Sequence, residues 1–156
     1  MPAPDLPGLI TADQIRATAA HIADWQLPSG MIPWFPGGHA DPWNHIEAAM
    51  ALAIGEHRAE AEAAYQWLVD CQRPDGSWHQ YYLEHEIEQD KLDANVIAYI
   101  ATGVWHHFSS TATRASSNRC GRWSTRRFAS CSIFSSLGAR SSGPGIPTAH
   151  PGRSPC

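Results

Sequence analysis

Two short stretches of this sequence, "WQLPSGMIPW" at residues 25–34 and "CQRPDGSWHQYY" at residues 71–82, share the pattern Gln-x-Pro-x-Gly followed by aromatic residues. The matching glutamines are Gln26 and Gln72, so the spacing is 72 − 26 = 46 residues. Proline stops a preceding helix because it has no amide hydrogen, and glycine permits the turn that follows. The glutamine amide can bond to backbone groups that the helix end leaves free. The pattern therefore predicts that both stretches end a helix and reverse the chain.

Apolar residues at helical spacing predict four helices around these turns. Thr11 and Gln14 have the spacing of a capping box, and Asp41 followed by Pro42 is a typical helix start. Gly55 ends the second helix, and either Asp90 or Asp93 caps the fourth. The expected helices cover about residues 12–26, 42–55, 57–72 and 92–107.

Long and short connections alternate along these helices. A tight turn joins the second helix to the third, which predicts an antiparallel pair. The two long connections, residues 28–42 and 73–92, then emerge on the same face and lead into the second and fourth helices. A repeat of this length is typical of a helical array in which neighbouring pairs bury each other. We expect a binding site on the face that carries the two long loops.

Charge divides the chain into two parts. Residues 1–108 hold all 15 acidic and four basic side chains, a net charge of −11, whereas residues 109–156 hold seven arginines and no acid, a net charge of +7. No apolar run reaches the roughly 20 residues of a membrane helix, and the start of the chain has no secretory leader pattern. No cysteine or histidine spacing of a zinc site is present. The composition predicts a cytoplasmic protein without a membrane span.

The segment 109–156 contains 12 serines and no helical stripe, so we expect it to be disordered. The gene can also be read in the frame that begins at the third base of each codon. With suitable synonymous codons for the residues from Asn118 onward, this frame encodes "PLWPVVDAALRFVLDLQQPRGE". That sequence is an amphipathic helix that ends in Gln-x-Pro-x-Gly. We therefore interpret the segment as the product of a frameshift near residue 109. The alternative is a native basic arm that binds nucleic acid or an acidic surface, but such arms favour Lys/Arg clusters with aromatic residues between them. We expect no nucleic-acid partner.

The helical pairs and the string Gln-x-Pro-Asp-Gly-Ser-Trp resemble the alpha/alpha toroids, which include the squalene-cyclase and prenyltransferase repeat proteins and the six-hairpin glycosidases. The stretches "SGMIPWFPGGHADPWNHIEAAMAL" and "AYIATGVWHH" are similar to actinobacterial proteins labelled prenyltransferase. The resemblance covers about residues 8–108. It implies an all-α fold, an incomplete toroid of two antiparallel hairpins in residues 1–108, followed by the tail.

Three functions follow from the resemblance and the residues. The first is a truncated prenyltransferase-like protein, inactive as given, although the chain has neither the DDxxD nor the DxDD motif of isoprenoid enzymes. The second is a six-hairpin glycosidase-like protein acting on an alpha-glucan or glycolipid, because aromatic faces and carboxylates suit sugars and glycoside cleavage needs two carboxylates. The third is a noncatalytic helical-repeat binding module. We expect a small isoprenoid or carbohydrate ligand, and neither a cofactor nor a metal.

Candidate site residues gather on the two long loops and the helix starts that follow them. The candidate catalytic carboxylates are Asp41, Glu47 and Asp93, for which helix capping or interaction with the helix dipole is the plain alternative. The candidate substrate-binding residues are Trp34, His39, Trp43, His45, Tyr82 and Asn95.

Overall fold

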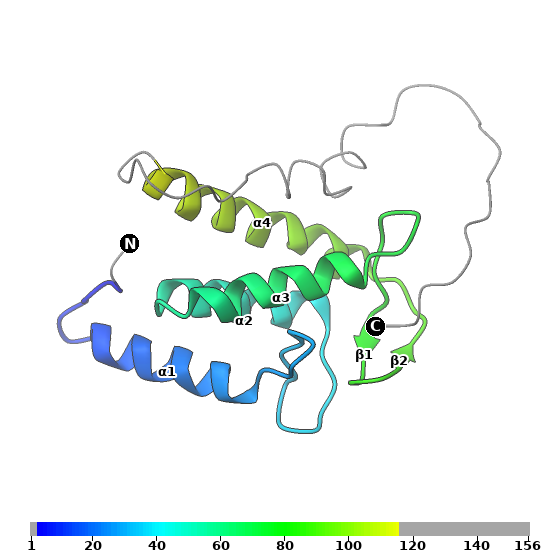
Figure 1. Ribbon diagram of the computed structural model, residues 1–156, viewed down its shortest axis with the longest axis horizontal. Coiled ribbons are helices and arrows are strands. Elements are labelled where there is room, and N and C mark those ends of the chain that lie inside the picture. Colours follow the sequence, from blue (N-terminus) through cyan, green and yellow to red (C-terminus); the bar gives the residue numbers. More distant parts are fainter. Residues whose placement is uncertain (1–2, 116–156) are drawn as a thin grey trace.

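The protein is described by a computed structural model, which covers the backbone of residues 3–115 and the side chains of residues 3–110 (Figure 1). The described part is mostly helical, as the sequence predicts. Its elements are α1 (Ala12–Trp25), α2 (Pro42–Ile54), α3 (Arg58–Asp70), β1 (Tyr81–Tyr82), β2 (Ile87–Gln89) and α4 (Ala94–Ala115). The expected disorder of residues 109–156 is wrong for residues 109–115, which belong to α4, and the rest of that segment lies outside the described part.

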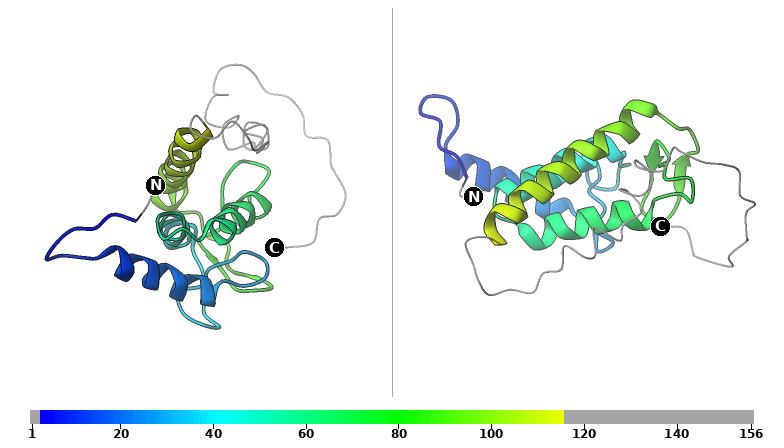
Figure 2. Two further views of the ribbon diagram at one scale, coloured as in Figure 1. Left: turned by 60° about the vertical axis from the view of Figure 1, so that its left-hand side comes forward. Right: turned by 90° about the horizontal axis from the view of Figure 1, so that it is seen from above.

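Helix α2 lies at the centre of the fold and contacts each of the other three helices (Figure 2). Helices α2 and α4 both begin at the end of the molecule where the strands lie, on the right of Figure 1. The loop between α1 and α2 and the loop between α3 and α4 meet at this end. This arrangement confirms the prediction that both long loops emerge on one face.

Local side chains define the helix starts. The Thr11 hydroxyl accepts the Gln14 amide hydrogen, and the Gln14 side chain accepts the Thr11 amide hydrogen, so the predicted capping box is present. Asp41 caps α2 by accepting from the backbone of Trp43 and Asn44. Of the two candidate caps for α4, Asp93 is the one that accepts backbone amides at the helix start.

The two Gln-x-Pro-x-Gly stretches form the same turn. The Gln26 side-chain amide donates to the Gly30 carbonyl at 2.9 Å, and the Gln72 side-chain amide donates to the Gly76 carbonyl at 3.1 Å. Gly30 and Gly76 have φ angles of 92° and 84°, a left-handed conformation that favours glycine. The structural interpretation of the repeat is therefore confirmed.

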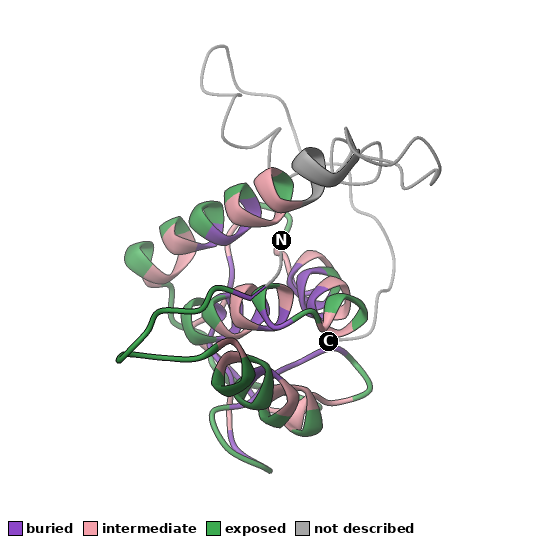
Figure 3. Ribbon diagram, turned by 90° about the vertical axis from the view of Figure 1, so that its left-hand side faces the viewer, coloured by how far each residue is buried: buried purple, intermediate pink, exposed green. Residues whose placement is uncertain are grey.

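The core lies between α2, α3 and α4 and is continued by Trp78 from the second long loop (Figure 3). The Trp78 indole donates to the Leu68 carbonyl at 2.7 Å, which fixes the loop against the end of α3. Helices α2 and α4 approach closely at Gly103, where a Cβ atom would lie 2.2 Å from Ile46. The largest fully buried side chains include Tyr65, Tyr82, Met31, Ile46, Leu52, Leu68 and Ile100.

Two features differ from the sequence prediction. The second long loop, expected to be irregular, contains the antiparallel pair β1–β2 with Tyr81 opposite Gln89. Helix α4 was expected to end at His106 and His107, but it continues to Ala115. No Gly or Pro occurs between residues 104 and 115, so nothing in the local sequence stops the helix. None of the helices in residues 3–115 is long and apolar enough to cross a membrane.

Candidate functional site

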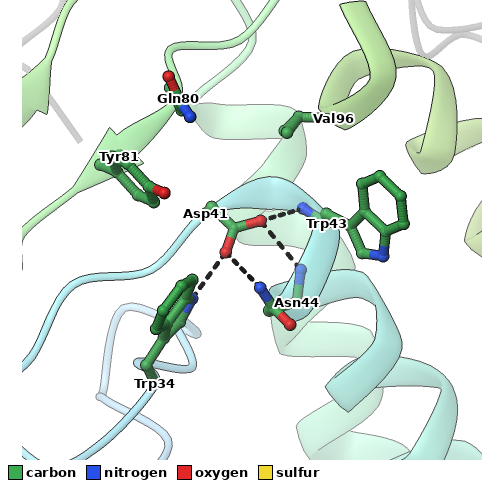
Figure 4. Close-up of a pocket in the computed structure, with 7 residues that line it drawn as sticks. All are labelled: Trp34, Asp41, Trp43, Asn44, Gln80, Tyr81 and Val96. Carbon is green, nitrogen blue, oxygen red and sulfur yellow. Dashed lines mark hydrogen bonds between the residues drawn. The ribbon is translucent and has the colours of Figure 1, made fainter. Parts of the chain in front are cut away.

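The two long loops are joined by a pair of backbone hydrogen bonds. The Ala40 amide donates to the Tyr82 carbonyl and the Tyr82 amide donates to the Ala40 carbonyl, both at 2.9 Å. Ala40 immediately precedes the cap of α2, and Tyr81 immediately precedes Tyr82. This bridge therefore brings Tyr81 to the start of α2, where Trp34 also lies (Figure 4).

Asp41 is the most highly connected side chain at this point and is only 3% exposed. One carboxylate oxygen accepts the backbone amides of Trp43 and Asn44. The other oxygen accepts the Trp34 indole N–H at 2.6 Å and the Asn44 side-chain amide at 2.7 Å (Figure 4). An ionised carboxylate has about four acceptor positions, and all four are used here. Asp41 therefore fixes the orientation of both side chains as well as capping the helix.

Aromatic rings form one wall beside Asp41. The Trp34 ring meets the Tyr81 ring edge-to-face, with centroids 6.1 Å apart. The His39 ring stacks on Tyr81 at 4.6 Å, and its Nδ1 lies 3.0 Å from a carboxylate oxygen of Glu88 on β2. The pair β1–β2, which the sequence did not predict, thus holds this wall together.

A second aromatic pair stands at the start of α2. The Trp43 ring stacks on Tyr99 of α4, with centroids 4.6 Å apart and planes inclined by 13°. The Trp43 indole donates to Glu47 at 3.0 Å. The Tyr99 hydroxyl also bonds to Glu47, which raises the pKa of the Tyr99 phenol. Glu47 is thereby held beside the Trp43–Tyr99 pair, on an exposed part of α2.

Some of these side chains line a cavity of about 280 Å³. The Gln80 side-chain oxygen is buried and has no hydrogen-bond partner among the described residues, and the same is true of His39 Nε2, beside the wall. Both atoms are enclosed by protein, and Figure 4 shows the Gln80 amide nitrogen, not its oxygen, turned toward Asp41. The lining consists of Trp34, Asp41, Trp43, Asn44, Gln80, Tyr81 and Val96 (Figure 4).

Of the predicted site residues, Trp34, Asp41 and Trp43 line the cavity. His39 contacts two of the wall residues, Trp34 and Tyr81, and Glu47 bonds to Trp43. The candidates Asp93 and Asn95 lie in the first turn region of α4 and do not line the cavity.

Two predicted binding residues are buried in the interior. His45 is 1% exposed and Tyr82 is 2% exposed. The Ile32 amide donates to His45 Nδ1 at 3.1 Å, so the ring hydrogen lies on Nε2, which donates to the Ala64 carbonyl at 2.9 Å. Burial lowers the pKa of His45 from 6.5 to about 4 and raises that of Tyr82 to about 12.

The sequence interpretation missed four lining residues, namely Asn44, Gln80, Tyr81 and Val96. Asn44 is three residues beyond the cap Asp41, and a polar side chain at that position can hydrogen-bond to the capping side chain. This spacing could have indicated that Asn44 lies beside Asp41. Gln80 and Tyr81 belong to the loop that the Ala40–Tyr82 bridge places here, and no local pattern indicates such a long-range bond. Residues 3–110 contain no group of three or more His, Cys, Asp or Glu side chains arranged to hold a metal ion.

Comparison with known proteins gives one informative relative. No family model matches the chain. Over 111 residues the chain is 50% identical to the MMP endo-(1,4)-3-O-methyl-alpha-D-mannosidase of Mycolicibacterium hassiacum. The match covers 71% of this chain and 31% of that protein, so the chain spans about a third of the relative's length.

This relative overturns the first functional expectation. At 50% identity the similar protein is named as a mannosidase, so the prenyltransferase interpretation of residues 8–108 is wrong. The toroid resemblance misled because one helical-repeat architecture serves unrelated reactions, so fold alone does not indicate function. The finding agrees better with the second expectation, a glycosidase-like protein. In the relative the sugar is a methylated mannose, not the alpha-glucan considered from the sequence.

Proposed function

We propose that residues 3–110 of this chain form a carbohydrate-binding part of a glycoside hydrolase that acts on 1,4-linked 3-O-methylmannose chains. The observation that carries the proposal is the cavity in which Asp41, two tryptophans and the side-chain amides of Asn44 and Gln80 converge. The relative at 50% identity supports the sugar class.

The lining chemistry suits a sugar. Trp34, Trp43 and Tyr81 offer ring faces and edges against which the C–H groups of a pyranose can pack. Asn44 Oδ1 can accept a hydroxyl hydrogen because the Asn44 nitrogen already donates to Asp41, and the Gln80 amide nitrogen can donate to a sugar oxygen (Figure 4). An isoprenoid diphosphate would instead require cations, and the lining contains no lysine or arginine.

The proposed role of Asp41 follows from its hydrogen bonds. Glycoside cleavage uses one carboxylic acid that donates a proton and one carboxylate that acts as base or nucleophile. Four donors point at the Asp41 oxygens, so a proton on this carboxyl group would displace one of them. Asp41 can therefore act as base or nucleophile only when one of these donors, such as the Trp34 indole, moves off its oxygen. Two other carboxylates were predicted to be catalytic. Glu47 lies beside Trp43 on α2, and Asp93 caps α4.

A second candidate function is binding without cleavage. Among the described residues, Asp41 is the one carboxylate in the cavity lining, whereas hydrolysis requires two. Such a protein would bind the same oligosaccharides without shortening them.

Titration calorimetry of the full chain tests the proposal. The ligands are a 1,4-linked 3-O-methylmannose oligosaccharide, its unmethylated counterpart, and an isoprenoid diphosphate with magnesium. We expect both oligosaccharides to bind, and Asp41→Asn to weaken binding by roughly 10- to 100-fold, because an amide cannot accept from all four donors. Chromatography of the incubated oligosaccharide separates cleavage from binding alone.

Asp75→Asn is the matched control. Asp75 is also an aspartate that accepts a backbone amide, from Ser77 at 3.0 Å, but it does not line the cavity. The control should bind as the unchanged chain does. Failure of both oligosaccharides to bind, or equal losses in the two variants, would refute the proposal.

A further inference from the structure

A second cavity lies on the other side of Trp34, between α1 and α2, with a volume of about 340 Å³. Its lining is Ile22, Trp25, Ile32, Pro33, Trp34, Asn44 and Ala48. Apart from Asn44 and the tryptophan indoles, these side chains are aliphatic and carry no charge. The cavity therefore differs sharply from its neighbour, whose lining includes Asp41, Gln80 and Tyr81.

The two cavities are neighbours that share Trp34 and Asn44. Both shared side chains are held by Asp41, at 2.6 Å and 2.7 Å, so the boundary between the cavities has a fixed geometry. Trp34 is 46% exposed, which leaves its ring accessible to a ligand. A ligand that spans both cavities would pass over the Trp34 ring and beside the Asn44 amide.

The apolar cavity is anchored to the interior. Ile32 is 5% exposed, and its amide donates to the buried His45 ring. Ile22 is partly buried and packs against the core. Because the core packs against these lining residues, the cavity presents a preformed apolar surface to a ligand.

We propose that this apolar cavity is the subsite that receives the O-methyl group of the sugar and so determines preference for methylated chains. The inference rests on the proposed function and deepens it. A methyl ether has lost its hydroxyl hydrogen, so it gains less than a free hydroxyl group from the polar lining that includes Asp41, Gln80 and Tyr81. Its methyl group gains by contact with Ile22, Trp25 and Ala48. Free hydroxyls therefore belong on the Gln80 side of Trp34, and the methyl group belongs on the Ile22 side.

The test compares the affinity of the full chain for the methylated oligosaccharide with its affinity for the unmethylated one. One additional methyl group in an apolar pocket is worth about 10-fold or more in discrimination. Ile22→Thr keeps the β-branched shape but replaces a methyl-bearing carbon with a hydroxyl. We expect it to reduce the ratio of the two affinities by roughly 3- to 10-fold, with little change in affinity for the unmethylated sugar.

Ile15→Thr is the matched control, because it makes the same change on α1 two turns earlier and outside the cavity lining. Ala48→Ser on α2 is a second variant, with a small perturbation of the fold, and should reduce the ratio in the same direction. A preference that is absent in the unchanged chain, or equal in Ile22→Thr, Ala48→Ser and Ile15→Thr, would overturn the subsite while leaving the proposed function intact. Failure of both sugars to bind would instead reject the proposed function.

Discussion

His45 is the side chain through which the interior holds the cavity-lining loop in place. It accepts from the Ile32 amide and donates to the Ala64 carbonyl, so it connects the first long loop to α3. Both bonds require the neutral ring with its hydrogen on Nε2. Protonation would place a second hydrogen against the Ile32 amide and a charge in the buried interior. The sequence placed His45 among the candidate substrate-binding residues, with packing as the alternative, and its burial and two hydrogen bonds show the packing role.

Acid should therefore destabilise the fold in a defined window. The pKa of His45 is about 4 in the folded protein and 6.5 as the ordinary value, so the unfolded chain binds the proton more readily. The stabilisation is complete above pH 6.5 and is lost as the pH falls toward about 4. The shift corresponds to about 3 kcal/mol of unfolding free energy. Urea unfolding at pH 7.5, 6, 5 and 4 measures this loss.

NMR titration of the His45 ring identifies the group responsible. Its resonances should remain those of the Nε2–H neutral form at pH 6, while stability already declines. The exposed His21 provides a control through His21→Asn, which should leave the pH dependence of unfolding unchanged. A His45 ring that titrates above pH 6 in the folded protein would contradict the prediction.

Asp41 shows how much a local pattern can indicate. The Asp-Pro dipeptide correctly predicted the cap of α2, because the capping amides are two and three residues away. Its bond to Trp34 at 2.6 Å depends on the path of the preceding loop. One carboxylate oxygen of Asp41 thus caps the helix, and the other holds the Trp34 and Asn44 side chains that line the cavity.

The two repeated turns are the elements that connect helix ends to the cavity loops. Each consists of a glutamine that bonds to the carbonyl of a left-handed glycine, and in the first repeat Gln26 also donates to the Glu60 carbonyl. The first turn therefore ties the end of α1 to α3 as well as reversing the chain. Its geometry depends on both a positive φ angle and a close approach to another helix.

Gly30→Ala should destabilise the protein more than Gly37→Ala. Both glycines have positive φ angles, 92° and 75°, so both variants incur the left-handed cost of about 1–2 kcal/mol. A Cβ atom on Gly30 would also lie 2.3 Å from the Ala63 carbonyl oxygen of α3, whereas a Cβ atom on Gly37 would meet nothing within 4 Å. Overpacking adds about 1–3 kcal/mol. Urea unfolding of the two variants measures the difference in unfolding free energy. Equal losses of unfolding free energy would show that α3 moves to accommodate the extra atom.

On the scale of the whole chain, the described helices form an array with α2 inside and α1 and α4 on its flanks. Trp105 and Phe108 of α4 are 66% and 47% exposed. The match to the mannosidase covers 111 residues, 71% of this chain. The change in net charge from −11 in residues 1–108 to +7 in residues 109–156 supports the proposal that a change of reading frame separates the two parts.

Sequencing of the genomic DNA from codon 100 to several hundred bases beyond codon 156 tests the proposed frameshift. We expect the frame that begins at the third base of each codon to encode further helical pairs with Gln-x-Pro-x-Gly ends. It should also continue the similarity to the mannosidase. An alternative frame without such helices, or with early stop codons, would show that the basic segment is native.

The sequence by itself determined where the helices begin, the caps of α1 and α2 and the two repeated turns, because the bonds involved join residues two to four positions apart. Thr11 with Gln14, Asp41 with the next amides and Gln26 with Gly30 are all of this kind. The sequence also predicted that both long loops meet at the starts of α2 and α4, since long and short connections alternate along the chain.

Only the tertiary structure decided which side chains meet there. The bonds between Ala40 and Tyr82 join residues far apart in the chain, and they bring Tyr81 and Gln80 to Asp41. Burial likewise assigned His45 and Tyr82 to the interior. Periodicity indicates which residues share one face of one element, but the contents of a cavity depend on how separate elements pack, and that depends on the whole chain.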